Sequence, residues 1–408
     1  MTTVRTLVAA LCLCALGLLP LPSFAATELV LWHAYRAEEK AALEKVVAEY
    51  NAANAAKGIK VTTLAVPYDA YADKISATVP RGKGPDLFIF AQDRLGGWIE
   101  SGNTVEPIDF YLDDATKKRF IPSTMEAMTY RGTTYGLPLN YKVITLIYNK
   151  KLVPVPPKTT GELVKLAKTL TDKKAGRFGL AYAYSDFYYH AALMNGFGGG
   201  VFGANVTPTL NSAQNVKSLE LMMKWLEKDG IVPTEPSTAL ITALFNEGKA
   251  AMVFSGPWFL GEVAKGVDYG LARLPILDEA GGKPMSPWMT VEGVYVAAPS
   301  KNKEAAYDFA RFLTEASSAK TLALEGRQSP SNQAVYSDAK VAADPQLKAM
   351  REQVEVAVPM PNVPEMSMVW SPATSAMNAI VKKASTPKAA MDVAQKAVAK
   401  DVANLRKK

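Results

Sequence analysis

The stretch "GPDLFIFAQDRLGGWIESG", residues 84–102, decides the fold. Its apolar run, residues 87–90, is typical of a strand that is buried on both faces. The run ends at a charged pair, Asp93 and Arg94, which two glycines follow. This ending has two interpretations. Either Asp93 caps a helix and Arg94 lies on the surface, or the pair belongs to a site for a polar ligand.

Strand and helix signals alternate before this stretch. Residues 28–33 ("ELVLWH") and 59–66 ("IKVTTLAV") are strand candidates that precede residues 87–90. Apolar residues at helical spacing, which predict a helix between the first two strands, are Leu43, Val46, Val47 and Tyr50. A second helix ends near Ile75. The order βαβαβ predicts a parallel sheet with helices on its faces, and hence an α/β fold.

The rest of the chain repeats this alternation and ends in helices. Thr159 and Glu162 form a capping box for a helix through Leu170, and a second helix begins with a cap at Asn211 or Ser212. The further strand candidates are 145–152, 178–184, 249–256 and 292–300. The tail predicts helices from about Met368 and Lys388. We expect two lobes joined by a hinge: residues 26–140 with about 292–325, and about 141–291 with 326–408.

The N-terminus has the pattern of a signal peptide. Arg5 precedes an apolar run, Leu7–Leu21, and small residues lead to Ala25, after which we expect cleavage. Both cysteines, Cys12 and Cys14, lie inside this segment, which excludes disulfides and thiol catalysis from the mature chain. We expect export to a periplasm, without a lipid anchor.

Composition argues against several classes of function. The formal net charge is +7, but lysines and arginines are spread along the chain, so we expect no nucleic-acid partner. The only histidines are His33 and His190, and no clustered carboxylates occur, so no metal site is predicted. No phosphate-binding loop, dinucleotide fingerprint or nucleophile elbow is present, so we expect no cofactor and no serine hydrolase.

Aromatic residues gather at the predicted ends of strands and helices. Examples are Tyr35, "YSDFYYH" (184–190), Trp258, Trp288 and Trp370. Aromatic faces beside oriented polar groups are typical of ligand clefts. Because open α/β sheets bind ligands at the carboxyl ends of their strands, this pattern favours the site interpretation of Asp93 and Arg94.

The sequence resembles the maltose/maltodextrin-binding proteins, the periplasmic sugar receptors of ABC importers. The resemblance covers nearly all of the mature chain. The stretches that carry it are "LVLW", "GIKV", "GPDLFIFAQDRLGG", "LIYNKKLVPVPPKT", "FNEGKAAMVFSGPW", "DYGLARLP" and "MPNVPEMS" followed by Trp370. It implies the two-lobe periplasmic-binding-protein fold, with a hinge between the lobes.

The resemblance also implies roles for individual residues. Asp93 and Arg94 match a pair that hydrogen-bonds sugar hydroxyls, and Arg94 is expected to hold Asp93 ionised. Trp258 and Trp370 match two stacking tryptophans that should lie on the lobe opposite Asp93. The other matched positions are Phe90 (a stacking aromatic), Asp186 and Tyr188 (an acid and a tyrosine), Met366 (a contact), and, loosely, Tyr35.

Three positions depart from the family pattern. Lys142 replaces a site glutamate on the strand that crosses between lobes, and Ser371 and Thr374 replace a tyrosine and an arginine. A lysine in place of a glutamate substitutes a donor for an acceptor and reverses the charge. These changes leave open whether the ligand is maltose, a longer maltodextrin, trehalose, sucrose or another α-glucoside.

The resemblance implies a monomeric receptor that closes around an oligosaccharide and delivers it to membrane permease subunits, without catalysis. A rival function is glycoside hydrolysis by Asp93 and Asp186, which would require the two carboxyl groups to be ~5–9 Å apart across the scissile bond. A structural or nucleic-acid-binding role would need a basic face.

Overall fold

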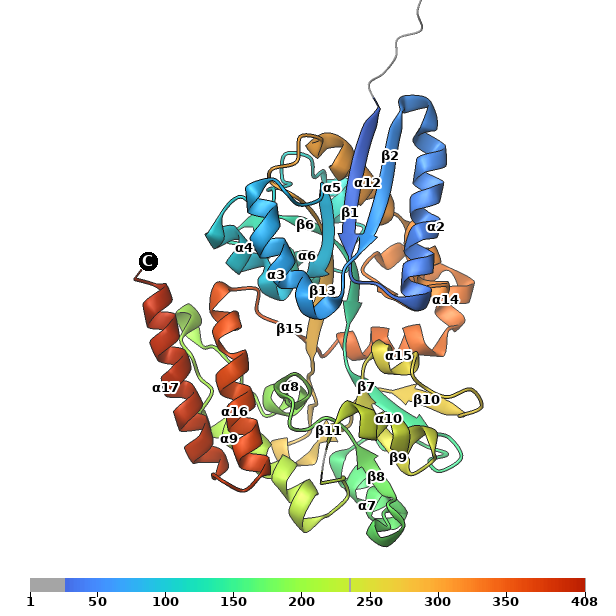
Figure 1. Ribbon diagram of the computed structural model, residues 1–408. Coiled ribbons are helices and arrows are strands. Elements are labelled where there is room, and N and C mark those ends of the chain that lie inside the picture. The colour runs from blue at the N-terminus through green and yellow to red at the C-terminus, as the bar shows by residue number, and fades with distance from the viewer. Residues whose placement is uncertain (1–25, 235, 408) are drawn as a thin grey trace, which may run out of the picture.

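The computed structural model describes residues 26–234 and 236–407, and the predicted signal peptide lies outside them. Figure 1 shows two lobes, each built around its own sheet. The predicted α/β two-lobe fold is therefore confirmed. Among the described residues, none of the helices is both long and apolar enough to cross a membrane.

The larger sheet begins with the predicted βαβαβ unit. The strands β1 (Thr27–His33), β2 (Ile59–Ala65) and β3 (Leu87–Ala91) are parallel, with β1 in the middle. The helices α2 (Ala37–Asn54) and α3 (Tyr68–Thr78) connect them. All five residues of β3 are buried, as expected for a strand covered on both faces.

Strands from later in the chain complete the larger sheet, whose order is β14-β6-β13-β3-β1-β2. The strand β13 (Trp288–Val296) is antiparallel to β3 and to β6 (Gly136–Lys142). The short strands β14 (Ser329–Pro330) and β15 (Val358–Pro359) pair with β6 and β13. The sheet is thus mixed, with antiparallel strands joining a parallel half.

Helices cover both faces of this sheet. One core lies under α2 and α12 (Lys303–Leu313), and the other under α3 and α4 (Leu95–Ser101). The remaining elements around this lobe are α5 (Asp114–Lys117), α6 (Pro122–Ala127), β4 (Thr129–Tyr130), β5 (Thr133–Thr134), α13 (Ala316–Leu324), α14 (Ala339–Ala343) and α15 (Pro345–Val354).

The smaller sheet has the order β10-β7-β9-β8. Its strands are β7 (Thr145–Asn149), β8 (Phe178–Ala181), β9 (Ala250–Ser255) and β10 (Tyr269–Ala272). The helices of this lobe are α7 (Thr160–Leu170), α8 (Phe187–Gly196), α9 (Ala213–Met223), α10 (Thr238–Asn246) and α11 (Pro257–Leu260). A small hairpin, β11 (Ile276–Leu277) and β12 (Lys283–Pro284), lies beside them.

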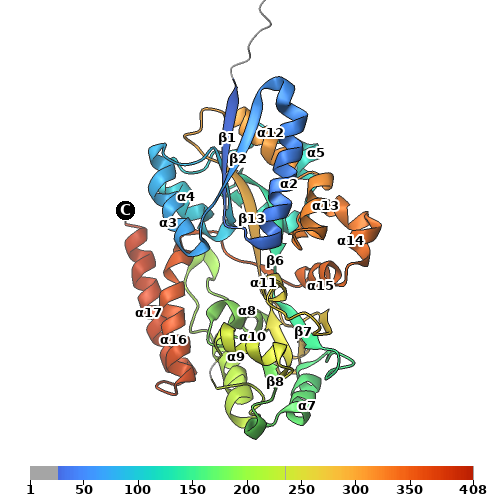
Figure 2. The same cartoon turned by 45° about the vertical axis from the view of Figure 1, so that its right-hand side comes forward.

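The C-terminal helices α16 (Trp370–Val381) and α17 (Pro387–Leu405) lie side by side on the flank of this lobe (Figure 2). The predicted starts near Met368 and Lys388 are therefore within two residues of the observed ones.

The chain passes between lobes along strands. The strand β6 ends at Lys142, and only Val143 and Ile144 separate it from β7 of the smaller sheet. The strand β13 starts at Trp288, which packs in the core of the smaller lobe, and ends in the larger sheet. These connections place the residues of two crossing strands between the lobes.

Several predicted boundaries are wrong. The strands predicted at 145–152 and 178–184 end three residues too late, because β7 ends at Asn149 and β8 at Ala181. The strand predicted at 292–300 begins four residues earlier, at Trp288, because "WMTV" is itself strand-forming and buried. The assignment of residues 326–408 to the second lobe fails around Ser329–Pro330, which pair with β6 in the larger sheet. A two-residue strand leaves almost no periodic signal.

Candidate functional site

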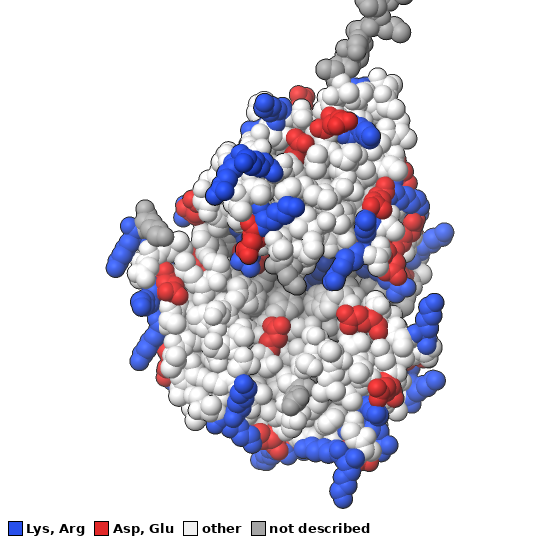
Figure 3. All heavy atoms as spheres, viewed as in Figure 1, with Lys and Arg blue, Asp and Glu red and all other residues white. Residues whose placement is uncertain are grey.

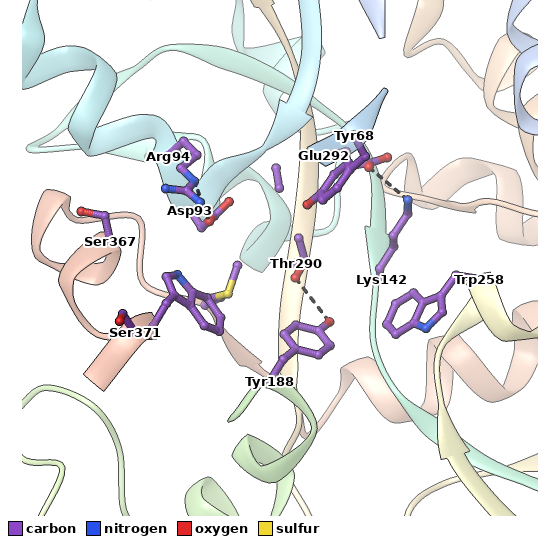
Figure 4. Close-up of a pocket in the computed structure, with 13 residues that line it drawn as sticks. Tyr68, Asp93, Arg94, Lys142, Tyr188, Trp258, Thr290, Glu292, Ser367 and Ser371 are labelled. Atoms are coloured by element: carbon purple, nitrogen blue, oxygen red, sulfur yellow. Dashed lines mark hydrogen bonds and ion pairs between the residues drawn. The ribbon is translucent and has the colours of Figure 1, made fainter. Parts of the chain in front are cut away.

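A cavity of about 550 Å³ lies between the two lobes, within the ~300–1,000 Å³ range of small-molecule sites. Figure 3 shows a hollow at this level, with acidic and basic side chains interspersed over the face. The residues that line the cavity are Tyr68, Ala91, Asp93, Arg94, Lys142, Tyr188, Trp258, Thr290, Glu292, Met360, Ser367, Trp370 and Ser371. Figure 4 shows them converging from both lobes.

The pair Asp93 and Arg94 lies just after β3, at the carboxyl end of that strand. Arg94 Nε is 3.4 Å from Asp93 Oδ2, and the Asp93 side chain is only 11% exposed. Burial raises the pKa of Asp93 to about 6, although Arg94 opposes this rise. From the sequence, Arg94 is expected to hold Asp93 ionised; with a pKa of about 6 the carboxyl group is mostly ionised at neutral pH, but desolvation outweighs the attraction of Arg94 and protonates it below about pH 6.

The turn that carries Asp93 is fixed by its neighbours Gln92 and Gly96. The buried Gln92 donates to the Met360 carbonyl (3.1 Å) and accepts from the Val291 amide (2.8 Å). The Gly96 amide donates to the Asn362 carbonyl at 2.8 Å. A Cβ on Gly96 would lie 2.4 Å from that oxygen, whereas one on Gly97 would meet nothing. Only the first glycine of the pair is required for close backbone approach.

Three aromatic residues of the cavity come from the smaller lobe side. Trp258 is the second residue of α11, shortly after β9. It is 40% exposed and donates from Nε1 to Tyr189 Oη at 3.0 Å. Its ring centroid is 6.0 Å from that of Tyr188 on α8. Trp370, at the start of α16, packs edge-on against Trp288 at 5.6 Å. These contacts fix the orientation of the rings before any ligand arrives.

Phe90 is not at the cavity surface, so its prediction as a stacking residue is wrong. It is 5% exposed and lies beneath Tyr68, whose ring is parallel to it at 5.7 Å. Tyr68 is 56% exposed and lines the cavity. The aromatic face on this lobe therefore comes from the start of α3 rather than from β3.

Three further predicted residues do not line the cavity. Asp186 caps α8 and accepts from the Tyr188 amide at 2.8 Å, an ordinary N-cap arrangement. Met366 is fully buried in the core of the smaller lobe. Tyr35 is 3% exposed, and its hydroxyl donates to Glu292 at 2.9 Å, so it supports the cavity from behind.

The cavity floor is formed by Lys142 on β6 and by Thr290 and Glu292 on β13. Thr290 lies opposite Lys142 in the strand register, and its Oγ1 is 3.4 Å from Tyr188 Oη. Lys142 Nζ is 3.0 Å from Glu292 Oε1. A carboxylate on the adjacent strand therefore lies beside Lys142, the position where the resemblance implies a glutamate.

Sequence reasoning missed six lining residues: Tyr68, Ala91, Thr290, Glu292, Met360 and Ser367. Ser371, named from the sequence only as a departure from the family pattern, does line the cavity. A usable signal existed for two of the missed residues, because Thr290 and Glu292 alternate with buried apolar residues and so share one face of a strand. The other four carry no distinctive chemistry or pattern.

The C-terminus holds one side of the cavity in place through Arg406. Its guanidinium lies 3.1 Å from Glu365, whose side chain is 11% exposed, in the segment Pro364–Met368 that carries Ser367. It also donates to the carbonyls of Asn205 (2.9 Å) and Val206 (3.2 Å). Both of those residues have positive φ, which strains a β-branched valine.

Arg406→Met should therefore lower the free energy of unfolding by about 1–2 kcal/mol, because it leaves a mostly buried carboxylate unpaired. Urea denaturation measures this loss. Lys407→Met is the matched control, because Lys407 is exposed and next to Arg406. Equal stability of the two variants would show that the Arg406 contacts contribute nothing.

Comparison with known proteins gives consistent matches along the chain. The profile described as bacterial extracellular solute-binding protein matches residues 45–349. A maltotriose-binding protein from Pyrococcus abyssi is 31% identical over 362 residues, 87% of this chain and 78% of the relative. A galactooligosaccharide-binding protein from Bacillus subtilis is 29% identical over 382 residues, 90% of this chain and 88% of the relative.

Solved structures show the same relationship. A cyclo/maltodextrin-binding protein complexed with maltotetraose superimposes with a TM-score of 0.83 at 30% identity, and the match covers 93% of this chain and 98% of that one. The two-lobe arrangement described above is thus found in a protein that holds an oligosaccharide.

Proposed function

Because this chain belongs to the bacterial extracellular solute-binding protein family, we propose that it is the oligosaccharide receptor of an ABC importer. Its ligands would be maltose- or maltodextrin-like sugars. The observation that carries this proposal is the cavity between the lobes, which pairs Trp258, Trp370 and Tyr188 with polar groups from the opposite side. Apolar ring faces suit the C–H faces of pyranoses, and the polar groups suit their hydroxyls.

The mechanism we propose is closure of the two lobes around the sugar. Ligand contacts with both lobes exist together only in the closed state, so binding favours that state. The hinge would lie where β6 continues into β7 and where β13 crosses between the sheets. We propose export to the periplasm and delivery of the sugar to permease subunits, with the expected lobe division changed so that residues 329–354 go with the larger lobe.

The sugar linkage is a second part of the proposal. The maltotriose-binding and galactooligosaccharide-binding relatives have nearly the same identity to this chain. Identity therefore does not distinguish α-glucosides from galactosides. We favour α-glucosides because the structural neighbour holds maltotetraose.

Glycoside hydrolysis has little support in the cavity. Asp186 does not line the cavity, and its carboxylate caps α8, so the required pairing with Asp93 is not formed. The relatives and structural neighbours are named as binding proteins. We propose that the chain binds its ligand without changing it.

A thermal-shift screen of the chain from Ala26 tests the function. The panel is maltose, maltotriose, maltotetraose, trehalose, sucrose, a galactooligosaccharide and cyclodextrins. A ligand that binds only the folded state stabilises it by about 4 kcal/mol at 1,000 times its Kd. A shift with maltotriose or maltotetraose supports the proposal, and incubation without release of shorter sugars supports the absence of hydrolysis. No shift with any sugar would refute it.

A further inference from the structure

The two crossing strands, which pair side by side, also carry an ion pair at the cavity, between Lys142 and Glu292. Lys142 Nζ is 3.0 Å from Glu292 Oε1 and 3.7 Å from an oxygen of Glu39 on α2. The side chains of Lys142 and Glu292 are 22% and 11% exposed. Both line the cavity, and Figure 4 shows their charged ends side by side.

Glu292 is held from behind by a chain of hydrogen bonds. Its Oε2 accepts from Tyr35 Oη at 2.9 Å, and that hydroxyl accepts from Asn140 Nδ2 at 2.8 Å. Burial, with the Glu292 and Glu39 charges, raises the pKa of Tyr35 well above its usual value, so the hydroxyl stays protonated and donating. The carboxylate is thus fixed in position and retains free lone pairs on both oxygens.

Lys142 remains charged and retains a donor for a ligand. Burial alone would lower its pKa, but the nearby Glu292 and Glu39 carboxylates outweigh burial and raise it. Its ammonium has three N–H groups, of which one donates to Glu292 at 3.0 Å, while Glu39, at 3.7 Å, is an ion-pair neighbour beyond hydrogen-bond distance. The cavity floor therefore offers one donor and one acceptor next to each other.

The cations of the cavity are balanced by carboxylates. Among the described residues that line it, Arg94 lies beside Asp93 and Lys142 lies beside Glu292. Glu39 adds a further acidic group behind Lys142. An acidic sugar would meet paired cations and repelling carboxylates, whereas a neutral sugar needs only hydroxyl donors and acceptors.

We propose that Lys142 and Glu292 act together as the specificity-determining pair for a neutral sugar, Lys142 donating to one hydroxyl and Glu292 accepting from its neighbour. This inference rests on the proposed function and adds Glu292 as a ligand-contacting residue. The pair acts as a unit, because loss of Lys142 leaves the mostly buried Glu292 carboxylate unpaired, and loss of Glu292 leaves Lys142 with only the more distant Glu39 carboxylate.

The test is a double-mutant cycle with Lys142→Met, Glu292→Gln and the double variant. Calorimetry measures Kd for the sugar that stabilises the wild-type protein most. Each single variant should weaken binding at least tenfold, and the double variant should lose much less than the product of the two losses. Lys150→Met, which breaks an exposed ion pair with Asp268 in the smaller lobe, is the control. If Lys142→Met does not fold, Lys142→Arg replaces it.

A second readout separates ligand contact from mere support of the fold. Kd is measured for maltotriose analogues that each lack one hydroxyl. The wild-type protein should reject one or two of them at least tenfold, and Glu292→Gln should reject those same analogues much less. If the single variants bind every sugar within twofold of wild type, Lys142 and Glu292 are not a specificity-determining pair. A wild-type protein that binds no sugar would overturn the proposed function, and this inference with it.

Discussion

Trp258→Ala is expected to weaken sugar binding about 100-fold. Trp258 presents a 40% exposed ring to the cavity, and its Nε1 hydrogen bond to Tyr189 keeps that ring in place. Truncating an interface tryptophan of this kind typically costs 2 kcal/mol or more, and about 2.7 kcal/mol corresponds to 100-fold in Kd. Calorimetry with the sugar that gives the largest thermal shift measures the change.

Trp258→Phe is the matched variant for this prediction. It keeps an aromatic face and loses the hydrogen bond to Tyr189, so we expect an intermediate loss of about tenfold. The melting temperature of the free protein should change little in either variant, because the ring is partly exposed already. Undiminished affinity of Trp258→Ala would contradict the assignment of this ring to the ligand.

The parts of the site that could be predicted from the sequence are those that follow a strongly apolar strand. Asp93, Arg94 and Trp258 all come just after strongly apolar strands, and the carboxyl ends of such strands face the cleft in an α/β fold. The apolar strand signal is strong and local in the sequence. The place of each of these residues in the fold can therefore be predicted from the few residues that precede it.

The errors arose where burial or capping competes with site chemistry. Phe90 lies in a buried strand and its ring is covered by Tyr68, so it does not reach the cavity. Asp186 has the local sequence of a helix N-cap, and it serves as one. A local pattern cannot tell a capping acid from a binding acid, because both precede a helix.

Residues that depend on long-range pairing were harder to find. Tyr68 covers Phe90 from the start of α3, an arrangement that only the tertiary packing reveals. Glu292 was missed because the strand was placed four residues too late, which left this residue at its expected first position instead of at the centre of β13. Correct boundaries would have placed Glu292 on the same strand face as Thr290, but its neighbour Lys142 comes from the long-range pairing of β13 with β6.

Replacing the Asp93 carboxyl group is expected to change sugar affinity and protein stability in opposite directions. Its pKa is about 6 in the folded protein and 3.8 in the unfolded chain. Between these values the folded state binds a proton that the unfolded state lacks. This carboxyl group therefore contributes stability below about pH 4, and that contribution is lost as the pH rises through 6.

Asp93→Asn removes the buried charge, so at pH 7.5 the unfolding free energy of the free protein should rise by about 1–3 kcal/mol. The upper value follows because a pKa that is about two units higher in the folded state corresponds to about 3 kcal/mol. The same change removes a charged acceptor for sugar hydroxyls. A hydrogen bond to a charged group contributes about 1.5–3 kcal/mol, so sugar affinity should fall at least about tenfold. Urea denaturation and calorimetry measure the two effects.

The pH dependence of binding separates this account from a general loss of packing. Wild-type affinity should fall by up to tenfold per pH unit below about pH 6, because protonated Asp93 loses its acceptor charge, whereas Asp93→Asn should show a flat profile between pH 5 and 7.5. Asp186→Asn, which changes an exposed N-cap outside the cavity, should keep the wild-type profile. A wild-type affinity that does not vary over this range would show that the sugar does not use the Asp93 carboxylate. The gain in stability without ligand would then be the only consequence of the substitution, and the burial of this charge would have no function in binding.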